Sequence, residues 1–339
     1  MSPAPLTSEQ PRQSVSRAPG VLAAIRLRRH LDRRVGRLRN RRGLATLERR
    51  KGDQRGRFAT QAARATEIHR LFVAHNAPAL MTDSWADYER ALVARLLPRP
   101  PFDFMSLGVL QETMLVRGRT MRRRELRYVC DRLPADERSR ALEEDLVGGP
   151  VLVRGPVPTS PTAIHHAYHL ARFTAATGVT APRAGTIVEW GGGHGGFARA
   201  LRRLGGDSPP THVILDLPAV LTLQWTFLTT IFGEDAVDVL TEPDRRPRPG
   251  AITLVPSGLA PSLDLDPGLF VSLWGLSESS PAAQQLAREQ WLPAPHLLLA
   301  YQPPSRQFPD AGAIGSMARE RGAKIEPLGV VRGSRYAFL

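Results

Sequence analysis

The sequence predicts an α/β fold in which a helical N-terminal region precedes a mainly parallel sheet. From residue 186 onward, short apolar segments alternate with helical segments, which is the pattern of a parallel sheet. A glycine-rich turn over residues 191–196 joins the first apolar segment to a helix. Two β-like segments, Lys324–Val331 and Ser334–Leu339, end the chain and predict an antiparallel hairpin at the edge of the sheet.

The remaining elements follow from hydrophobic period and from glycine and proline signals. We expect strands at Thr186–Trp190, His212–Asp216, Leu269–Leu273 and His296–Tyr301, and shorter ones at Val237–Leu240 and Ile252–Val255. We expect helices at Thr60–His75, Asp83–Leu97, Phe104–Val116, Arg119–Leu133, Asp136–Leu146, Pro161–Thr177, Phe197–Leu204, Ala219–Phe232, Pro281–Trp291 and Ala313–Arg321. Linker signals then divide the chain into an arm (1–57), a helical cap region (58–158) and the sheet domain (159–339).

The length and composition of the chain limit the classes of protein to which it can belong. A chain of 339 residues with 42% hydrophobic residues has room for one large domain with an appendage, or for two domains. The single cysteine, Cys130, excludes a disulfide framework and a cysteine-based zinc site, and it suits a reducing cytosol. We find neither an apolar run of transmembrane length nor a signal peptide, so we expect a cytoplasmic protein without an integral membrane segment.

The net charge of +14 is concentrated near the N-terminus. Residues 21–57 hold fourteen basic and three acidic residues and so account for +11 of it. Nearly all the basic residues are arginine, a bias that is typical of a GC-rich genome. Residues 1–57 are interpreted as a disordered, Arg-rich arm, which is either a solvated extension or a contact for an anionic surface such as lipid, RNA or an acidic carrier protein.

The glycine-rich turn predicts a pocket for a nucleoside. The stretch from Ile187 to Gly196 reads I-V-E-W-G-G-G-H-G-G. Glycines let the backbone approach a ligand closely, where any Cβ would clash. Asp216 ends the next strand, where a carboxylate reaches the hydroxyls of a ribose.

Two cofactors fit such a pocket. Gly191, Gly193 and Gly196 match the dinucleotide fingerprint G-x-G-x-x-G. The stretch beginning at Glu189 also matches E-x-G-x-G-x-G, which resembles motif I of class I methyltransferases that use S-adenosylmethionine (SAM). An acidic side chain there repels a pyrophosphate but suits the cationic methionine part of SAM. We therefore expect SAM, bound by Glu189, Gly191, Gly192, Gly193, Gly195, Asp216, Leu217 and Ser257.

Longer segments resemble the bacterial sugar O-methyltransferases of natural-product and surface-glycan gene clusters. Their motif E-I-G-G-G-Y-G-G-L-A-R-x-L is similar to Glu189–Leu201, with His194 in place of the tyrosine. Their I-x-D-L-P segment is matched by Ile214–Pro218, and their serine-rich S-L-S-E-M segment by Trp274–Ser279. The resemblance covers about residues 80–339 and leaves out the basic arm.

This resemblance implies a Rossmann-like class I methyltransferase sheet and O-methylation of a sugar hydroxyl on a secondary metabolite or glycan. The acceptor must be aligned with the methyl group and must lose its proton. Glu278 follows the fourth strand, whose carboxyl end faces the cofactor crevice, and it is the favoured base. The other candidates are His194 in the glycine turn and, on one helix face, His165 and His169. No metal is expected, because no paired carboxylate stands near these histidines.

Three alternatives stay open at this point. The chain could methylate a non-sugar small molecule, it could be an NAD(P)-dependent oxidoreductase, or it could be a noncatalytic binding module whose arm is the functional part. Glu189 argues against the oxidoreductase. The complete set of glycines, together with Asp216, argues against a noncatalytic scaffold.

Overall fold

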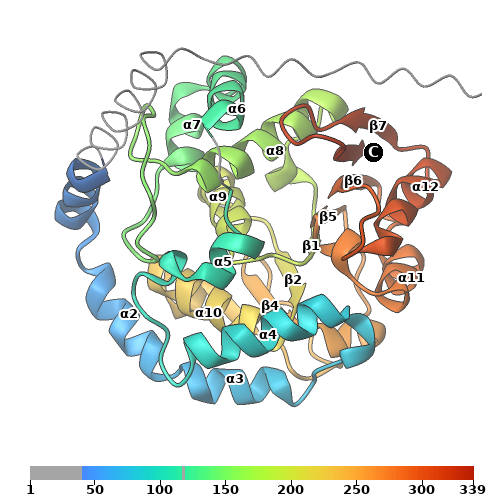
Figure 1. Ribbon diagram of the computed structural model, residues 1–339, viewed down its shortest axis with the longest axis horizontal. Coiled ribbons are helices and arrows are strands. Elements are labelled where there is room, and N and C mark those ends of the chain that lie inside the picture. Colours follow the sequence, from blue (N-terminus) through green and yellow to red (C-terminus); the bar gives the residue numbers. More distant parts are fainter. Residues whose placement is uncertain (1–39, 117–118) are drawn as a thin grey trace, which may run out of the picture.

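The computed structural model describes residues 40–116 and 119–339 (Figure 1). After a helix over residues 40–51, the α-helices are α2 (Gln54–Ala63), α3 (Ala65–Val73), α4 (Asp83–Leu96), α5 (Gly108–Thr113), α6 (Arg119–Arg132), α7 (Ala135–Leu142), α8 (Pro161–Thr177), α9 (Gly196–Gly205), α10 (Pro218–Phe232), α11 (Pro281–Gln290) and α12 (Ala313–Glu320). The strands are β1 (Ile187–Trp190), β2 (His212–Asp216), β3 (Val237–Val239), β4 (Ile252–Pro256), β5 (Leu269–Leu273), β6 (His296–Tyr301), β7 (Lys324–Pro327) and β8 (Arg335–Phe338).

These strands form one sheet with the order β3-β4-β2-β1-β5-β6-β8-β7. All pairs from β3 to β6 are parallel, and β8 lies antiparallel between β6 and β7. The chain moves outward from β1 in one direction through β2 and in the other through β5. The topological switch point, where open α/β sheets bind ligands, therefore lies at the carboxyl ends of β1 and its neighbours. The sheet is Rossmann-like and parallel, with an antiparallel C-terminal hairpin, and the predicted fold class is confirmed.

Helices cover both faces of the sheet. On one face Ile187 packs in a cluster with Phe173 of α8 and Phe197 of α9. On the other face Val188 packs in a cluster with Ala283 of α11. Successive strand residues point to opposite faces, so a parallel sheet covered on both sides requires the continuous apolar runs that the sequence contains.

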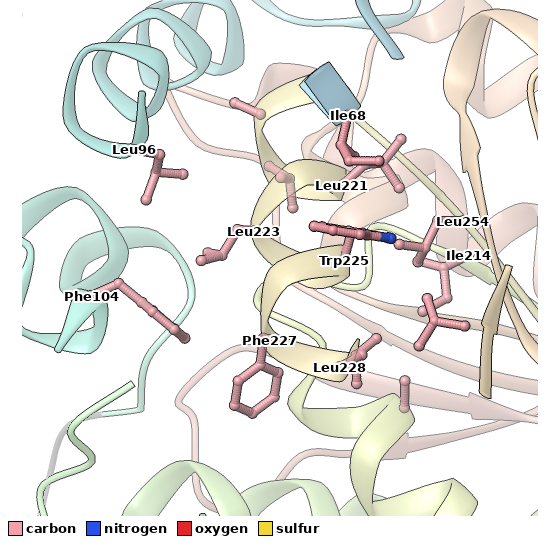
Figure 2. Close-up of a cluster of buried hydrophobic side chains, with 14 of the residues drawn as sticks. Ile68, Leu96, Phe104, Ile214, Leu221, Leu223, Trp225, Phe227, Leu228 and Leu254 are labelled. Atoms are coloured by element: carbon pink, nitrogen blue, oxygen red, sulfur yellow. The ribbon is translucent and has the colours of Figure 1, made fainter. Parts of the chain in front are cut away.

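Helix α10 is buried between the sheet and the N-terminal helices. Every residue from Pro218 to Thr230 is buried, including Trp225 and Phe227. Figure 2 shows Leu96 of α4 and Phe104 on one side of α10, with Ile214 and Leu254 of the strands on the other. A helix that is apolar all round is a core helix, and α10 accordingly joins the N-terminal region to the sheet in one hydrophobic cluster.

The N-terminal helices differ in detail from the prediction. The single helix predicted at Thr60–His75 is two, α2 and α3, separated at Arg64. The helix predicted at Phe104–Val116 is a short 3-10 turn (Phe104–Ser106) followed by α5. Hydrophobic period could not resolve these breaks, because the apolar contacts that set them come from α10, more than a hundred residues away.

The basic arm is shorter than predicted. Leu47 is fully buried against Leu146 and Leu152. The Lys51 Nζ lies 3.1 Å from Asp145 Oδ1, and the buried Gln54 donates a hydrogen bond of 2.9 Å to the same oxygen. Residues 40–57 are therefore helical and packed on the body of the protein, while the rest of the predicted arm, residues 1–39, lies outside the described residues. None of the described helices combines the length and apolar character needed to cross a membrane.

Candidate cofactor and acceptor site

A cavity of about 430 Å³ lies at the carboxyl ends of the central strands. This volume is within the range of about 300–1,000 Å³ found for small-molecule sites. Its floor is the glycine turn and the residues that follow β2, β4 and β5. One wall is α8, and the other side is covered by residues 112–116 and by Trp85 of α4. Eleven of the twelve site residues predicted from the sequence line this cavity; Gly195 does not.

The glycine turn requires glycine at two cavity positions. Gly191 has a φ of +78°, and a Cβ there would lie 2.9 Å from the Gly275 Cα. Gly193 has a φ of +54°, and a Cβ there would have an ordinary contact with Met114 at 3.8 Å as its nearest neighbour. Both positions favour glycine because a side chain is strained at positive φ. The predicted Gly195 instead precedes the first residue of α9, and its Cβ would meet Leu228 at 3.3 Å.

Asp216 is held in place by two hydrogen bonds. Its Oδ1 accepts the Leu217 N–H at 2.8 Å, and its Oδ2 accepts the Gln224 amide at 2.8 Å. Gln224 also donates to the Gly193 carbonyl at 2.8 Å, so it ties the Asp216 carboxylate to the glycine turn. Sequence reasoning missed Gln224. The sequence feature that could have identified Gln224 is an amide side chain within a mostly apolar helical segment.

Burial shifts the pKa of two carboxyl groups near this end of the cavity. Burial raises the pKa of Asp216 to about 8, and the Leu217 N–H partly offsets the rise. Burial also raises the pKa of Glu89, on α4, to about 7. Glu89 accepts the Ala219 N–H at 2.7 Å, so the N-terminal region contacts the first turn of α10 directly.

Glu189 and Ser257 are buried at the cavity floor. The Glu189 Oε2 lies 3.0 Å from the Nε2 of His212, which is also buried. The Ser257 Oγ has no hydrogen-bond partner among the described residues. An unsatisfied buried hydroxyl is costly, which is consistent with a ligand partner at this position.

Helix α8 carries three histidines to the cavity wall. Ser160 caps its first turn by accepting the Ala163 N–H, Pro161 begins it, and Gly178 ends it in the left-handed conformation. His165, His166 and His169 all line the cavity. Burial, and then neighbouring histidines, hold the pKa values of His166 and His169 well below the usual range, so both rings are neutral.

Trp274 adjoins these histidines from the end of β5. Its ring stacks on His165 with centroids 5.4 Å apart and planes at 24°. Its φ is +69°, the only positive value among the described non-glycine residues. A bulky residue in this conformation is strained, and such strain concentrates at functional sites.

Glu278 lies on the same side of the cavity. Its Oε2 accepts the Trp85 indole N–H at 3.1 Å. Burial raises the pKa of Glu278 to about 7, with the Trp85 hydrogen bond opposing the rise. A carboxyl group with a pKa near neutrality can donate a hydrogen bond to a hydroxyl when protonated and accept its proton when ionised. A candidate general base needs this property.

His194 occupies the glycine turn. Its ring packs beside His166 at 5.9 Å and beside Phe227 at 5.6 Å. Burial, and then the charge of Arg199, lower the pKa of His194 to about 4. A ring that resists protonation this strongly is a weak base, so His194 suits packing or cofactor contact better than proton transfer.

Comparisons with known proteins give distant likenesses only. No protein-family model matches the sequence, and no curated protein matches it. Among solved structures, the chain is similar to the pyocyanin biosynthetic protein PhzM at 12% identity and a TM-score of 0.34, over 52% of this chain and 56% of that one. It is similar to the magnesium protoporphyrin IX methyltransferase of Synechocystis PCC 6803 with bound SAM at 14% identity and a TM-score of 0.35, over 51% and 78%.

A third solved structure, the mitomycin 7-O-methyltransferase MmcR, matches at 14% identity and a TM-score of 0.33, over 52% of this chain and 56% of that one. The chain therefore matches little more than half the length of PhzM and MmcR. At these scores the function must be argued from the site itself.

Proposed function

We propose that this protein is a SAM-dependent O-methyltransferase for a small-molecule hydroxyl. The observation that carries the proposal is that one cavity joins a nucleoside end to a proton-accepting end. The nucleoside end has Gly193 and Asp216, and the proton-accepting end has Glu278, His165 and His169. Methyl transfer needs these two things in one place, because SAM supplies an activated methyl group and the acceptor must only be aligned and deprotonated.

The charge of the cavity supports SAM over a nicotinamide dinucleotide. Among the described residues that line it, Glu112, Glu189, Asp216 and Glu278 are acidic and none is Lys or Arg. Such a lining offers a pyrophosphate no cationic side chain, whereas its carboxyl groups attract a sulfonium cation where they are ionised. Gly191, Gly192 and Gly193 would hold the methionine part, and Asp216, with Leu217 and Ser257 beside it, would hold the ribose.

We further propose a sugar as the acceptor. Trp85 and Trp274 line the acceptor side, and the Glu278 carboxyl lies between α4 and the end of β5. Aromatic faces combined with a carboxyl group suit a ring that is apolar on its faces and carries hydroxyls on its edge. The same surface also accepts a non-sugar phenol or alcohol, so the acceptor must be determined by assay.

Calorimetry of the purified full-length protein tests the cofactor. We expect SAM and S-adenosylhomocysteine (SAH) to bind with one site per chain, and NADH and NADPH to give no heat of binding. Binding of NADH without any response to SAH would overturn the proposal. Transfer of a labelled methyl group from SAM to p-nitrophenyl glycosides or to simple phenols would then separate the sugar acceptor from the non-sugar alternative.

A further inference from the structure

A fully buried carboxylate lies behind the histidine wall of the cavity. Glu125, on α6, is 0% exposed, and its Oε1 lies 2.5 Å from the Nδ1 of His165. The Glu125 Oε2 has no hydrogen-bond partner among the described residues. Burying a carboxylate without hydrogen-bond partners is costly. The imidazole of His165 is the hydrogen-bond partner that the described residues give to Glu125.

This contact selects the tautomer of His165. An ionised carboxylate can only accept a hydrogen bond, so with Glu125 ionised the Nδ1 of His165 carries the proton and donates it to Glu125. The Nε2 is then the basic nitrogen of the ring. His165 also lines the cavity, and Trp274 stacks on its ring, so the imidazole is fixed both in tautomer and in orientation.

The other histidines of the wall are not oriented in this way. His169 contacts the Tyr336 hydroxyl through Nδ1 at 2.6 Å, and its Nε2 is buried without a partner. The Nδ1 of His166 is likewise buried without a partner. Two carboxylate–imidazole pairs of the described chain reach the cavity: Glu189–His212 reaches it through its carboxylate, and Glu125–His165 through its imidazole.

We propose that His165 is the general base of the methyl transfer and that Glu125 is its positioning residue; this inference rests on the proposed function. The acceptor O–H bond breaks and its proton moves to His165 Nε2. The acceptor oxygen forms a bond to the methyl carbon, and the electron pair of the broken S–CH₃ bond stays on sulfur, leaving neutral SAH. Glu125 stabilises the imidazolium that results, as a base–orienter pair requires.

Under this proposal Glu278, the base favoured by the sequence, binds the acceptor hydroxyl instead. Its Oε2 already accepts the Trp85 N–H, and no described group orients it further toward a proton. Glu278→Gln should then raise the acceptor KM more than it lowers kcat. His165→Gln and Glu125→Gln should lower kcat by about 10²- to 10⁴-fold, the usual contribution of general acid–base catalysis, with SAH affinity unchanged.

A spectroscopic measurement tests the pair without turnover. NMR of the SAH-bound protein with nitrogen-labelled histidine should show His165 protonated at Nδ1 and unprotonated at Nε2, with the Nδ1 proton shifted downfield. Glu125→Gln should remove that shift. Asp131→Asn, on the exposed side of the same helix, is the matched control and should change neither the spectrum nor turnover.

The outcomes separate the two proposals. If the wild-type protein does not bind SAH, the proposed function itself is overturned. With SAH bound, a proton on Nε2 of His165, or a Glu125→Gln variant that keeps the downfield signal, would overturn the pair alone. Normal turnover in His165→Gln together with a collapse of kcat in Glu278→Gln would return the role of base to Glu278.

Discussion

At the residue scale, Asp216 is a buried carboxyl group that lines the cavity. Burial raises its pKa to about 8 in the protein without ligand, so below that pH the group is mostly neutral. The ionised form accepts hydrogen bonds from ribose hydroxyls and attracts a cationic ligand more strongly. Binding of SAM should therefore strengthen as pH rises through about 8 and weaken below it.

This pH dependence can be measured by calorimetry with SAM across that range. Asp216→Ala removes the carboxylate and should lower affinity by about 10- to 150-fold, which corresponds to about 1.5–3 kcal/mol for charge-assisted hydrogen bonds. The variant should also lose most of the pH dependence. A folded Asp216→Ala protein with unchanged affinity would show that the ribose lies elsewhere.

Gly193 gives a second prediction at this scale. A Cβ on Gly193 would point into the cavity, 3.8 Å from the nearest atom of Met114. Gly193→Val should therefore abolish SAH binding, because its side chain occupies the space of the methionine moiety. Gly178→Val is the matched control: Gly178 also has a positive φ, but it ends α8 with nothing within 4 Å of its Cβ. If Gly178→Val loses SAH binding as completely as Gly193→Val, backbone strain rather than occupied space explains the loss.

At the element scale, a buried ion-pair network joins the helices around the glycine turn. Arg199 of α9 contacts Glu144, and Ser160 at the start of α8 donates to the same carboxylate. Arg203 contacts Asp145 at 2.9 Å. The helix that begins at the glycine turn is thus fixed to the segment that precedes α8.

Breaking this network should destabilise the fold. Glu144→Gln leaves Arg199 buried without its full countercharge and should cost about 3–5 kcal/mol of the free energy of unfolding, measured by urea denaturation. Glu320→Gln, which disrupts an exposed pair with Arg288, should cost about 0–1 kcal/mol. Equal effects of the two variants would show that the buried pair contributes no more than a surface pair.

The same network predicts the response to acid. Burial raises the pKa of Asp145, but Arg203 and Arg199 outweigh it and lower the value to about 2. A folded pKa below the ordinary value of about 3.9 gives stability that is present above that value and is lost as pH falls toward 2. Urea midpoints should fall across this window, and less so in Asp145→Asn.

At the scale of the whole molecule, the N-terminal region completes the site. Glu89 binds the first turn of α10, Trp85 binds Glu278, and Met114 lies over the glycine turn. The N-terminal helices are therefore expected to hold both the cofactor end and the acceptor end.

Two deletions test the extent of this integration. Removing residues 1–39 should leave SAH affinity and thermal stability unchanged, because the contacts of Leu47 and Gln54 with the body remain. Removing residues 1–57 eliminates both contacts and should lower the melting temperature and weaken SAH. If the protein without residues 1–57 keeps full stability, the arm ends at residue 57, as the sequence predicted. Salt-sensitive binding to anionic vesicles that is lost with residues 1–39 would identify that segment as the surface contact.

The sequence by itself determined the sheet and the cofactor end. Strand alternation, the glycine turn and Asp216 are local features, because the chain direction and the required φ values are set within a few residues. Glu189, Leu217, Ser257 and Glu278 line the cavity because they lie at or just after the carboxyl ends of parallel strands, which meet at one edge of the sheet.

Only the tertiary structure decided which residues act together. The contacts of Glu125 with His165, of Gln224 with Gly193, and of Trp85 with Glu278 join residues 31 to 193 positions apart. No periodicity encodes such pairs, because they depend on how α4 and α10 pack around the cavity and on how α6 packs against α8. The same reason explains the folding of residues 40–57: their arginine content predicts solvation, whereas the burial of Leu47 depends on Leu146 and Leu152, a hundred residues along the chain.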